Sequence, residues 1–205
     1  TNSYANEKFV GFVDTLEGNE TITKGENSVK LNEFDQIFIN DIIEVDIGTS
    51  IIISFADNSL LTLKDESEFS VKEFDKDSSD PSFILSITKG KFTFESGSIA
   101  KNKDGIMKVK LSGLDVKLNG TLITGENSEG NKNVSLLEDS TGNLGTLEIG
   151  IEGSSETRII SDSASGVSLD FTDEEQQALL NGDTSNLTTT LSSSEDTQLS
   201  EEEEN

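Results

Sequence analysis

Apolar and polar residues alternate with a period of two along most of the chain up to about Phe171. In such a segment one face is apolar and the other polar or charged, which is typical of a half-buried β-strand. Two further segments, Ile37–Val45 and Ile51–Phe55, are more uniformly apolar, which predicts deeper burial. The clearest alternation occurs in Ser70–Phe74, Lys91–Glu95, Met107–Leu111 and Leu114–Leu118.

Turn residues (Gly, Asn and Asp) separate these segments at a spacing of roughly 8–12 residues, the signature of an all-β domain. No segment before residue 171 keeps a helical period. We therefore expect an all-β fold over residues 7–171, either a single twisted β-sandwich or a short β-solenoid-like domain, after an N-terminal extension of residues 1–6. The apolar residues of this range, including the eleven phenylalanines, are expected to supply its core.

The strand pattern is followed by a helix signal. Thr172 and Glu175 have the spacing of a capping box, and Gly182 is a stop signal, so a short helix is predicted over residues 172–182. Beyond it the chain is rich in Ser, Thr and Glu with scattered Leu, and it buries too little apolar surface to offset ordering entropy. Residues 183–205 are expected to be an acidic disordered tail or linker.

Charge narrows the class of partner. The chain carries 40 acidic and 15 basic residues, a net charge of −25, which repels nucleic acid and anionic lipid. No run approaches the ~18–20 apolar residues of a membrane helix, so no membrane insertion is predicted in this segment. The expected partner is another protein or a further copy of the chain, and no nucleic acid.

One acidic run is a candidate metal site. Asp75, Asp77 and Asp80 lie within six residues, and hard cations such as calcium prefer several carboxylate oxygens on a flexible loop. The run lacks the glycine and the distal glutamate of an EF-hand loop, so a solvated acidic loop around Pro81 is the alternative. No other cofactor is predicted, because the chain has neither Cys nor His.

No residue pattern predicts an enzyme. A serine nucleophile would here need a lysine base, and Ser86–Lys89 and Ser98–Lys101 have the Ser-x-x-Lys spacing. That spacing puts both side chains on one face only in a helix, and both runs lie in predicted strands and turns. Arg158, the only arginine, is expected to pair with a neighbouring carboxylate.

The order of short motifs over residues 8–121 resembles the FecR domain of bacterial extracytoplasmic proteins, especially the stand-alone alphaproteobacterial versions. The closing motif of that family keeps Gly120-Thr121 here but loses its Pro and Arg. The matching elements are the opening Gly11, Val13, Leu16 and Gly18, then Asn40-Asp41, Asp57-Asn58-Ser59, Lys89–Phe92 and Ser96–Lys101.

The resemblance implies an extracytoplasmic β domain, whether periplasmic, cell-surface or secreted. In the best-known members this domain is part of a transmembrane regulator that relays a signal from a receptor to a sigma factor. The chain shows neither the transmembrane helix nor the anti-sigma segment, so signalling is not carried over. We expect a non-catalytic interaction domain that binds an envelope or surface partner. Two alternatives are a structural subunit of a surface layer, adhesin or filament that assembles through strand edges, and a calcium-dependent surface module.

Overall fold

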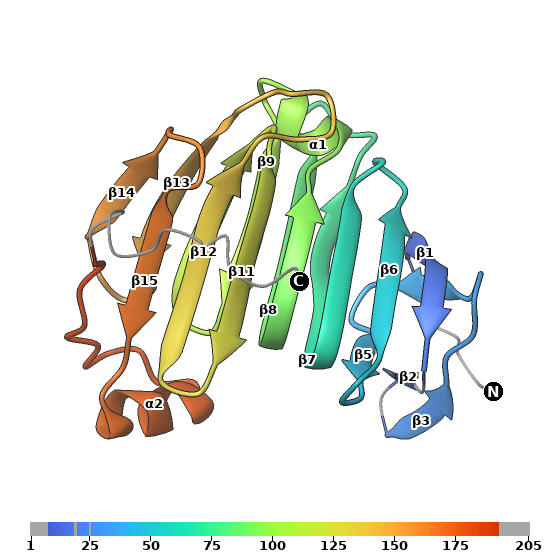
Figure 1. The fold of residues 1–205 in the computed structure, drawn as a ribbon, viewed down its shortest axis with the longest axis horizontal. Helices are drawn as coiled ribbons and strands as arrows, with labels where there is room; N and C mark the ends of the chain where they lie inside the picture. Colours follow the sequence, from blue (N-terminus) through green and yellow to red (C-terminus); the bar gives the residue numbers. More distant parts are fainter. Residues whose placement is uncertain (1–7, 19, 25, 193–205) are drawn as a thin grey trace, which may run out of the picture.

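The computed structural model describes residues 8–18, 20–24 and 26–192, and these form 15 strands and two helices (Figure 1). The strands belong to one continuous, mixed sheet of 15 strands. The period-two alternation thus led to strands almost throughout, and the predicted all-β fold is confirmed.

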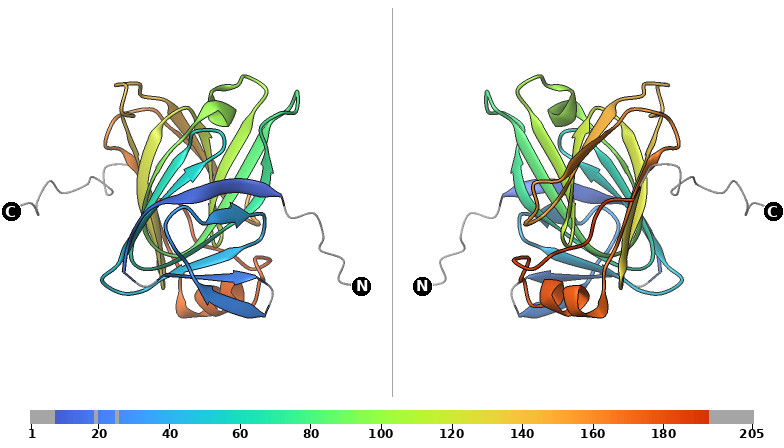
Figure 2. Two further views of the ribbon diagram at one scale, coloured as in Figure 1. Left: turned by 90° about the vertical axis from the view of Figure 1, so that its right-hand side faces the viewer. Right: turned by 90° about the vertical axis from the view of Figure 1, so that its left-hand side faces the viewer.

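The sheet folds over into two layers that enclose the core, and Figure 2 shows these layers on end. The front layer contains part of β7 (Leu60–Asp75) and of β8 (Ser82–Glu95), together with β1 (Phe9–Glu17), β4 (Gln36–Phe38), β6 (Ser50–Phe55), β11 (Leu122–Ser128), β12 (Asn131–Leu137) and β15 (Gly166–Asp170). The back layer contains the rest of β7 and β8, with β2 (Glu20–Lys24), β3 (Asn27–Lys30), β5 (Ile42–Val45), β9 (Ile106–Leu111), β10 (Leu114–Asn119), β13 (Thr146–Ile151) and β14 (Thr157–Ile160).

Two long neighbouring strands, β7 (Leu60–Asp75) and β8 (Ser82–Glu95), run through both layers. β7 pairs with β6 up to Lys64 and with β5 from Ser67 onward. β8 pairs in parallel with β9 near its start and antiparallel with β11 near its end. Because both strands change partners at the same level, the hairpin carries the sheet from one layer into the other.

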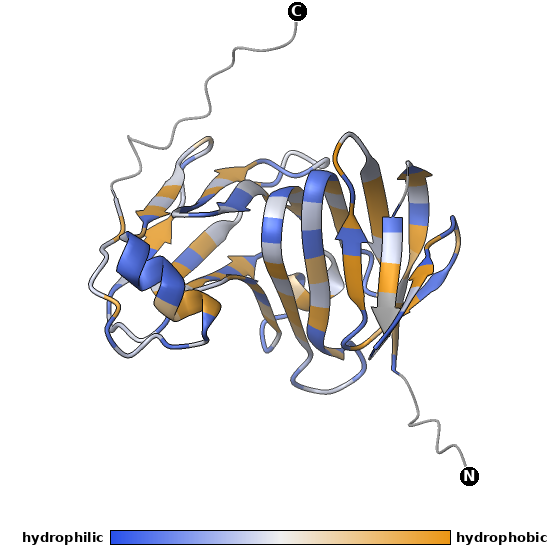
Figure 3. Ribbon diagram, turned by 90° about the horizontal axis from the view of Figure 1, so that it is seen from below, coloured by the Kyte–Doolittle hydropathy of each residue, from blue (hydrophilic) through white to orange (hydrophobic). Residues whose placement is uncertain are grey.

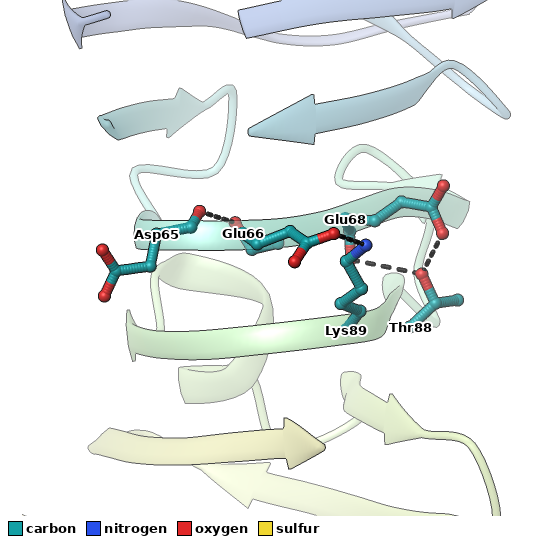
Figure 4. Close-up of polar contacts among 6 residues, drawn as sticks. Asp65, Glu66, Glu68, Thr88 and Lys89 are labelled. Carbon is teal, nitrogen blue, oxygen red and sulfur yellow. Dashed lines mark hydrogen bonds and ion pairs between the residues drawn. The ribbon is translucent and has the colours of Figure 1, made fainter. Parts of the chain in front are cut away.

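The change of layer occurs at a bulge (Figure 4). The register passes from Lys64 opposite Lys91 to Glu68 opposite Lys89, so residues 65–67 of β7 face Gly90 alone. The backbone turns through left-handed conformations at Asp65 (φ 58°) and Gly90 (φ 105°). Side chains along the bulge form local polar contacts, with the Lys89 ammonium on the Glu66 carboxylate and the Thr88 hydroxyl on that of Glu68.

Four phenylalanine rings pack against one another between the two layers. Phe83 of the back layer lies 4.9 Å, ring centroid to centroid, from Phe55 of the front layer in an edge-to-face arrangement. Phe74 contacts the same ring at 4.9 Å, and Phe94 lies 6.0 Å from it. All four rings are buried, and edge-to-face pairs add to the hydrophobic stabilisation. The core therefore depends on the bulge bringing the two halves of the hairpin face to face.

A short helix, α1 (Ser98–Lys101), closes one open end between the layers by burying Ile99 and Ala100. This corrects the prediction that no helix precedes residue 171 and that Ser98–Lys101 lies in a strand or turn. Four residues are too few to show a helical period in sequence. Its apolar pair is buried where α1 packs beside β9 and β10, and local sequence cannot indicate this burial.

The predicted capping box and helix stop are confirmed in α2 (Asp173–Leu180). The Thr172 hydroxyl accepts from the Glu175 amide at 3.2 Å, and the Glu175 carboxylate accepts from the Thr172 amide at 3.3 Å. Gly182 is left-handed (φ 76°), and its amide donates to the Leu179 carbonyl at 2.9 Å. These contacts end the helix in the manner expected of a glycine after the C-cap.

The chain after Gly182 differs from the predicted disordered tail. Leu191 is only 4% exposed and belongs to the core, and the Ser192 amide donates to the Ser168 carbonyl of β15 at 3.1 Å. Residues 183–192 therefore pack on the domain, with Leu187 and Leu191 against its core. Residues 193–205 of the predicted tail, and the predicted extension 1–6, lie outside the described residues.

The bend at Gly90 gives a testable prediction. A Cβ on Gly90 would lie 2.3 Å from Ser67 Cβ and 2.7 Å from its Cα, and the left-handed backbone adds strain. We expect Gly90→Ala to lower the free energy of unfolding by about 3 kcal/mol or more, measured by urea denaturation. Gly48→Ala is the matched control, because Gly48 is also left-handed (φ 76°) but has no atom within 4 Å of the added Cβ. It should cost only about 1 kcal/mol. Equal losses in both variants would show that packing at the bulge is unimportant.

Candidate interaction surface

The motif Asp57-Asn58-Ser59 forms a buried turn between β6 and β7. The Asp57 carboxylate accepts from the Ser59 amide at 3.0 Å and from the Ser59 hydroxyl at 2.9 Å. The Ser59 hydroxyl in turn accepts from the Gly97 amide at 2.8 Å, which ties this turn to the start of α1. Asn58 is left-handed (φ 68°), the conformation that a Gly adopts easily. Asp57 and Ser59 are buried and hold the closed end of the domain, whereas Asn58 is exposed at the tip of the turn.

A second motif pair has the same structural role. The Thr121 amide donates to the Ser96 hydroxyl at 2.8 Å, and the Ser96 amide donates to the Thr121 carbonyl at 3.0 Å. Both residues are buried, and together they join the end of β8 to the start of β11. The motif residues that survive in this chain are therefore framework, and an interaction site has to be sought elsewhere on the surface.

The three candidate calcium ligands lie where β7 turns into β8. Asp75 accepts hydrogen bonds from the amides of Asp77 and Ser78 at 3.2 and 3.1 Å, and the Asp77 carboxylate pairs with Lys76 at 3.0 Å. Across the described ranges, no three acidic side chains are placed to hold one metal ion. The loop does not bring Asp75, Asp77 and Asp80 together, and calcium binding stays a prediction.

The structure places the two Ser-x-x-Lys pairs that were considered for catalysis in different elements. Ser86 and Lys89 lie in β8 as expected, whereas Ser98 and Lys101 are exposed on α1.

Arg158 lies 3.8 Å from the Glu156 carboxylate, which confirms the expected ion pair. It also donates to the Ser192 carbonyl at 2.9 Å and so helps to hold the packed part of the tail.

Two strand edges have backbone groups that are already engaged. On β4 the Phe38 amide donates to the Asp41 carboxylate at 2.9 Å. On β15 the Ser168 carbonyl accepts from both the amide and the hydroxyl of Ser192. β3 is short and fully exposed, and it carries Lys30. Covered, short and charged edges are the usual means of preventing one sheet from adding to another.

Three phenylalanines are exposed at the N-terminal end of the front layer. Phe9, Phe12 and Phe34 are 41%, 37% and 71% exposed, and we call them the aromatic edge. This corrects the prediction that all the phenylalanines supply the core. Six others are buried, namely Phe55, Phe69, Phe74, Phe83, Phe92 and Phe94.

Backbone irregularity produces the aromatic edge. Residues three apart in a regular strand point to opposite faces, but the register of β1 shifts between Phe9 and Gly11. Phe9 then pairs with Phe38 and Phe12 with Gln36, two positions on one face of β4. Phe34 adopts a left-handed backbone (φ 69°) in the loop before β4. No local sequence signal marks such a bulge, and sequence reasoning therefore missed these residues.

Acidic side chains lie next to Phe12 and Phe34 of the aromatic edge, whereas Lys8 directly precedes Phe9. Asp14 follows Phe12 in β1, while Glu33 and Asp35 flank Phe34. The Glu33 carboxylate accepts from the Leu16 amide at 3.3 Å, and that of Asp35 from the Asn32 amide at 2.8 Å. The surface thus has an apolar centre and an acidic rim, the general anatomy of a protein-binding patch.

At the opposite end, a buried carboxylate fixes the tail. Glu175 accepts from the amides of Thr188 and Thr189 at 2.8 and 2.9 Å, in addition to closing the capping box. Burial by itself would raise the pKa of this carboxyl. The hydrogen bonds from Thr189, Thr188 and Thr172 outweigh burial and lower the pKa from 4.5 to about 2. One side chain therefore caps α2 and holds the segment that covers β15.

The architecture defines the class of protein, a two-layered mixed β domain whose motif residues form the framework. The family model described as FecR protein matches residues 41–140. This match confirms, over residues 41–140, the resemblance to the FecR domain that the order of motifs predicted. The match begins after the Gly11–Gly18 opening and extends beyond Thr121 to residue 140, so its limits differ from the expected 8–121. No curated protein matches the sequence.

Solved structures agree on the fold. Two crystal structures of a candidate anti-sigma factor from Parabacteroides distasonis resemble this chain with a TM-score of 0.51 each, at 10% and 12% sequence identity. The match covers 74% of this chain and 59% of the anti-sigma factor chain. It therefore spans about three fifths of the length of that chain. At this identity the likeness concerns the fold alone. In the described residues, neither helix has the length and apolar character needed to cross a membrane.

The Glu175 contacts predict a pH-dependent contribution to stability. We expect Glu175→Ala to lower the free energy of unfolding at pH 7 by about 2–3 kcal/mol, because charged hydrogen bonds to the tail are lost. Since the pKa is lowered on folding, this contribution is complete above about pH 4.5 and disappears as the pH falls toward 2. Urea titrations of the two proteins should therefore converge at acid pH.

Glu174→Ala is the control, because Glu174 is an exposed neighbour on the same turn. It should change stability by less than about 0.5 kcal/mol. A loss in Glu175→Ala that stays constant down to pH 2 would contradict the assigned pKa.

Proposed function

We propose that this chain is a non-catalytic, extracytoplasmic interaction domain that binds one protein partner through the aromatic edge. The observation that carries the proposal is the exposure of Phe9, Phe12 and Phe34 in a chain whose other phenylalanines are largely buried. Clustered exposed aromatic residues cost solvation free energy and are enriched at the centres of protein interfaces. The motif residues Asp57, Ser59, Ser96 and Thr121 are not available for this role, because they are buried in the framework.

The charge around the aromatic edge specifies the chemistry of the partner. Glu33, Asp35 and Asp14 give the rim a negative potential, and the whole chain carries a net charge of −25. Complementarity then requires a partner with an apolar centre and a basic rim. Long-range attraction would speed the encounter, and the aromatic contacts would provide most of the affinity.

The comparisons with known proteins support a regulatory role for this domain. The chain carries a FecR domain, and the solved structures with a similar fold belong to a protein described as an anti-sigma factor. We infer that this domain likewise acts by binding a protein. Its proposed position outside the cytoplasm rests on the resemblance to the FecR family.

Assembly through strand edges is the less favoured function. The outer backbone groups of β4 and β15 are engaged by Asp41 and Ser192, so a neighbouring strand would first have to displace these contacts. Side-chain docking on the aromatic edge requires no such displacement.

Site-specific photocrosslinking tests the proposal. A photoreactive phenylalanine analogue replaces Phe12 or Phe34 in the full chain, expressed in the cell that produces it. We expect both positions to crosslink one and the same protein, recovered outside the cytoplasm. Phe12→Ala combined with Phe34→Ala should reduce binding of that purified protein at least about a hundredfold, since two interface aromatics are removed.

Ile159, which is 70% exposed on β14, provides the matched control. The analogue at position 159 should give no product, and Ile159→Ala should leave the affinity unchanged. A crosslink only between two copies of the chain would favour self-assembly. No crosslink at positions 12 and 34, or equal products at position 159, would overturn the aromatic edge as the docking surface.

A further inference from the structure

A lysine occupies an inward-facing position of the front layer. In β12 the residues Lys132, Val134 and Leu136 share the face that points into the core, and Lys132 is only 2% exposed. Its direct cross-strand neighbour in β11 is Asn127, which is also buried. Two polar residues thus lie side by side where the alternation of both strands calls for apolar ones. Departures of this kind are expected at functional sites.

The ammonium group of Lys132 is incompletely satisfied. It has three donors, and within the described residues it makes one hydrogen bond, to the Ser128 carbonyl at 2.8 Å. It also lies 5.0 Å from the centroid of the Phe171 ring, a distance suited to a cation–π contact. None of the ion pairs found in the described residues involves Lys132. Burial lowers the pKa of this lysine, although Glu129 opposes the change.

A pocket of about 290 Å³ opens beside this lysine, between the β11–β12 hairpin and α2. One wall is polar and held in place, because the Asn127 amide donates to the Ile87 carbonyl at 2.7 Å and to the Ser112 hydroxyl at 3.1 Å. The lining also includes Glu129 and Gln176, together with an apolar wall formed by Leu179 and Leu180. The last turn of α2 is hydrophobic, whereas the rest of the helix is hydrophilic (Figure 3).

An unpaired buried cation is costly unless an anion accompanies it. The pocket provides room for one next to the ammonium, and its size lies near the lower limit of small-molecule sites. The apolar wall favours an organic ion over an inorganic one. We propose that this pocket binds a small organic carboxylate, with its carboxylate on Lys132 and a short apolar chain against Leu179 and Leu180.

Hexanoate is a suitable probe, with inorganic phosphate and 1-hexanol as probes that each lack one of the two recognised features. Isothermal titration calorimetry on the full chain should show one hexanoate per chain. Phosphate and hexanol should bind at least about tenfold more weakly, since each forgoes the apolar or the charged contact. Equal binding of phosphate would show an anion site without selectivity for a carboxylate, and no binding of hexanoate at millimolar concentration would overturn the proposal.

Lys132→Met removes the charge and keeps most of the side-chain length. We expect hexanoate to bind at least tenfold more weakly, which corresponds to the loss of a charge-assisted contact. The melting temperature should stay equal or rise, because replacing a buried unpaired charge with an apolar group is often stabilising. A purely structural lysine would behave differently, since its loss would lower the melting temperature. Unchanged hexanoate affinity in Lys132→Met would also overturn the proposal.

Two further variants keep the test decisive. Lys89→Met is the control, because Lys89 lines the same pocket but is ion-paired with Glu66, so its replacement should change the affinity less than twofold. Leu180→Ser alters the apolar wall at a side chain that is 67% exposed, so folding is preserved. It should weaken hexanoate binding about fivefold and leave phosphate binding unchanged. Hexanoate affinity that is insensitive to Leu180→Ser would exclude the apolar contact.

Discussion

The structure depends on a single backbone constraint, the bend that carries β7 and β8 from one layer into the other. Residues 65–67 of β7 must fit opposite Gly90, and only a residue without a Cβ leaves room for Ser67 there. Once the hairpin folds over, Phe55 and Phe94 of the front layer meet Phe74 and Phe83 of the back layer. Core packing, closure by α1 and the continuity of the sheet all follow from this bend.

The residues that carry the family resemblance serve this framework. Asp57 and Ser59 fix the β6–β7 turn against α1, and Ser96 and Thr121 join β8 to β11. In this chain the distinguishing features lie on the periphery, in the aromatic edge at one end and the lysine pocket at the other. Such a separation of framework from binding surface allows one fold to serve different partners.

Two buried charges near α2 differ in how they are compensated. Glu175 accepts backbone and hydroxyl hydrogen bonds from Thr172, Thr188 and Thr189, and these hold it ionised and fix the tail. Lys132 has a single hydrogen bond and an aromatic ring, and it lines a pocket. A charge whose hydrogen bonds are all made within the chain is structural. One with donors to spare beside a pocket is available to a ligand.

The sequence by itself determined what short-range physics controls. Alternation with a period of two fixed most strands, and the local chemistry of Thr172, Glu175 and Gly182 fixed the last helix. Only the tertiary structure decided that Phe9 and Phe12 face solvent, that α1 is helical and that Leu191 is buried. Each of these outcomes depends on packing or pairing with other segments of the chain. A local sequence pattern does not specify such contacts.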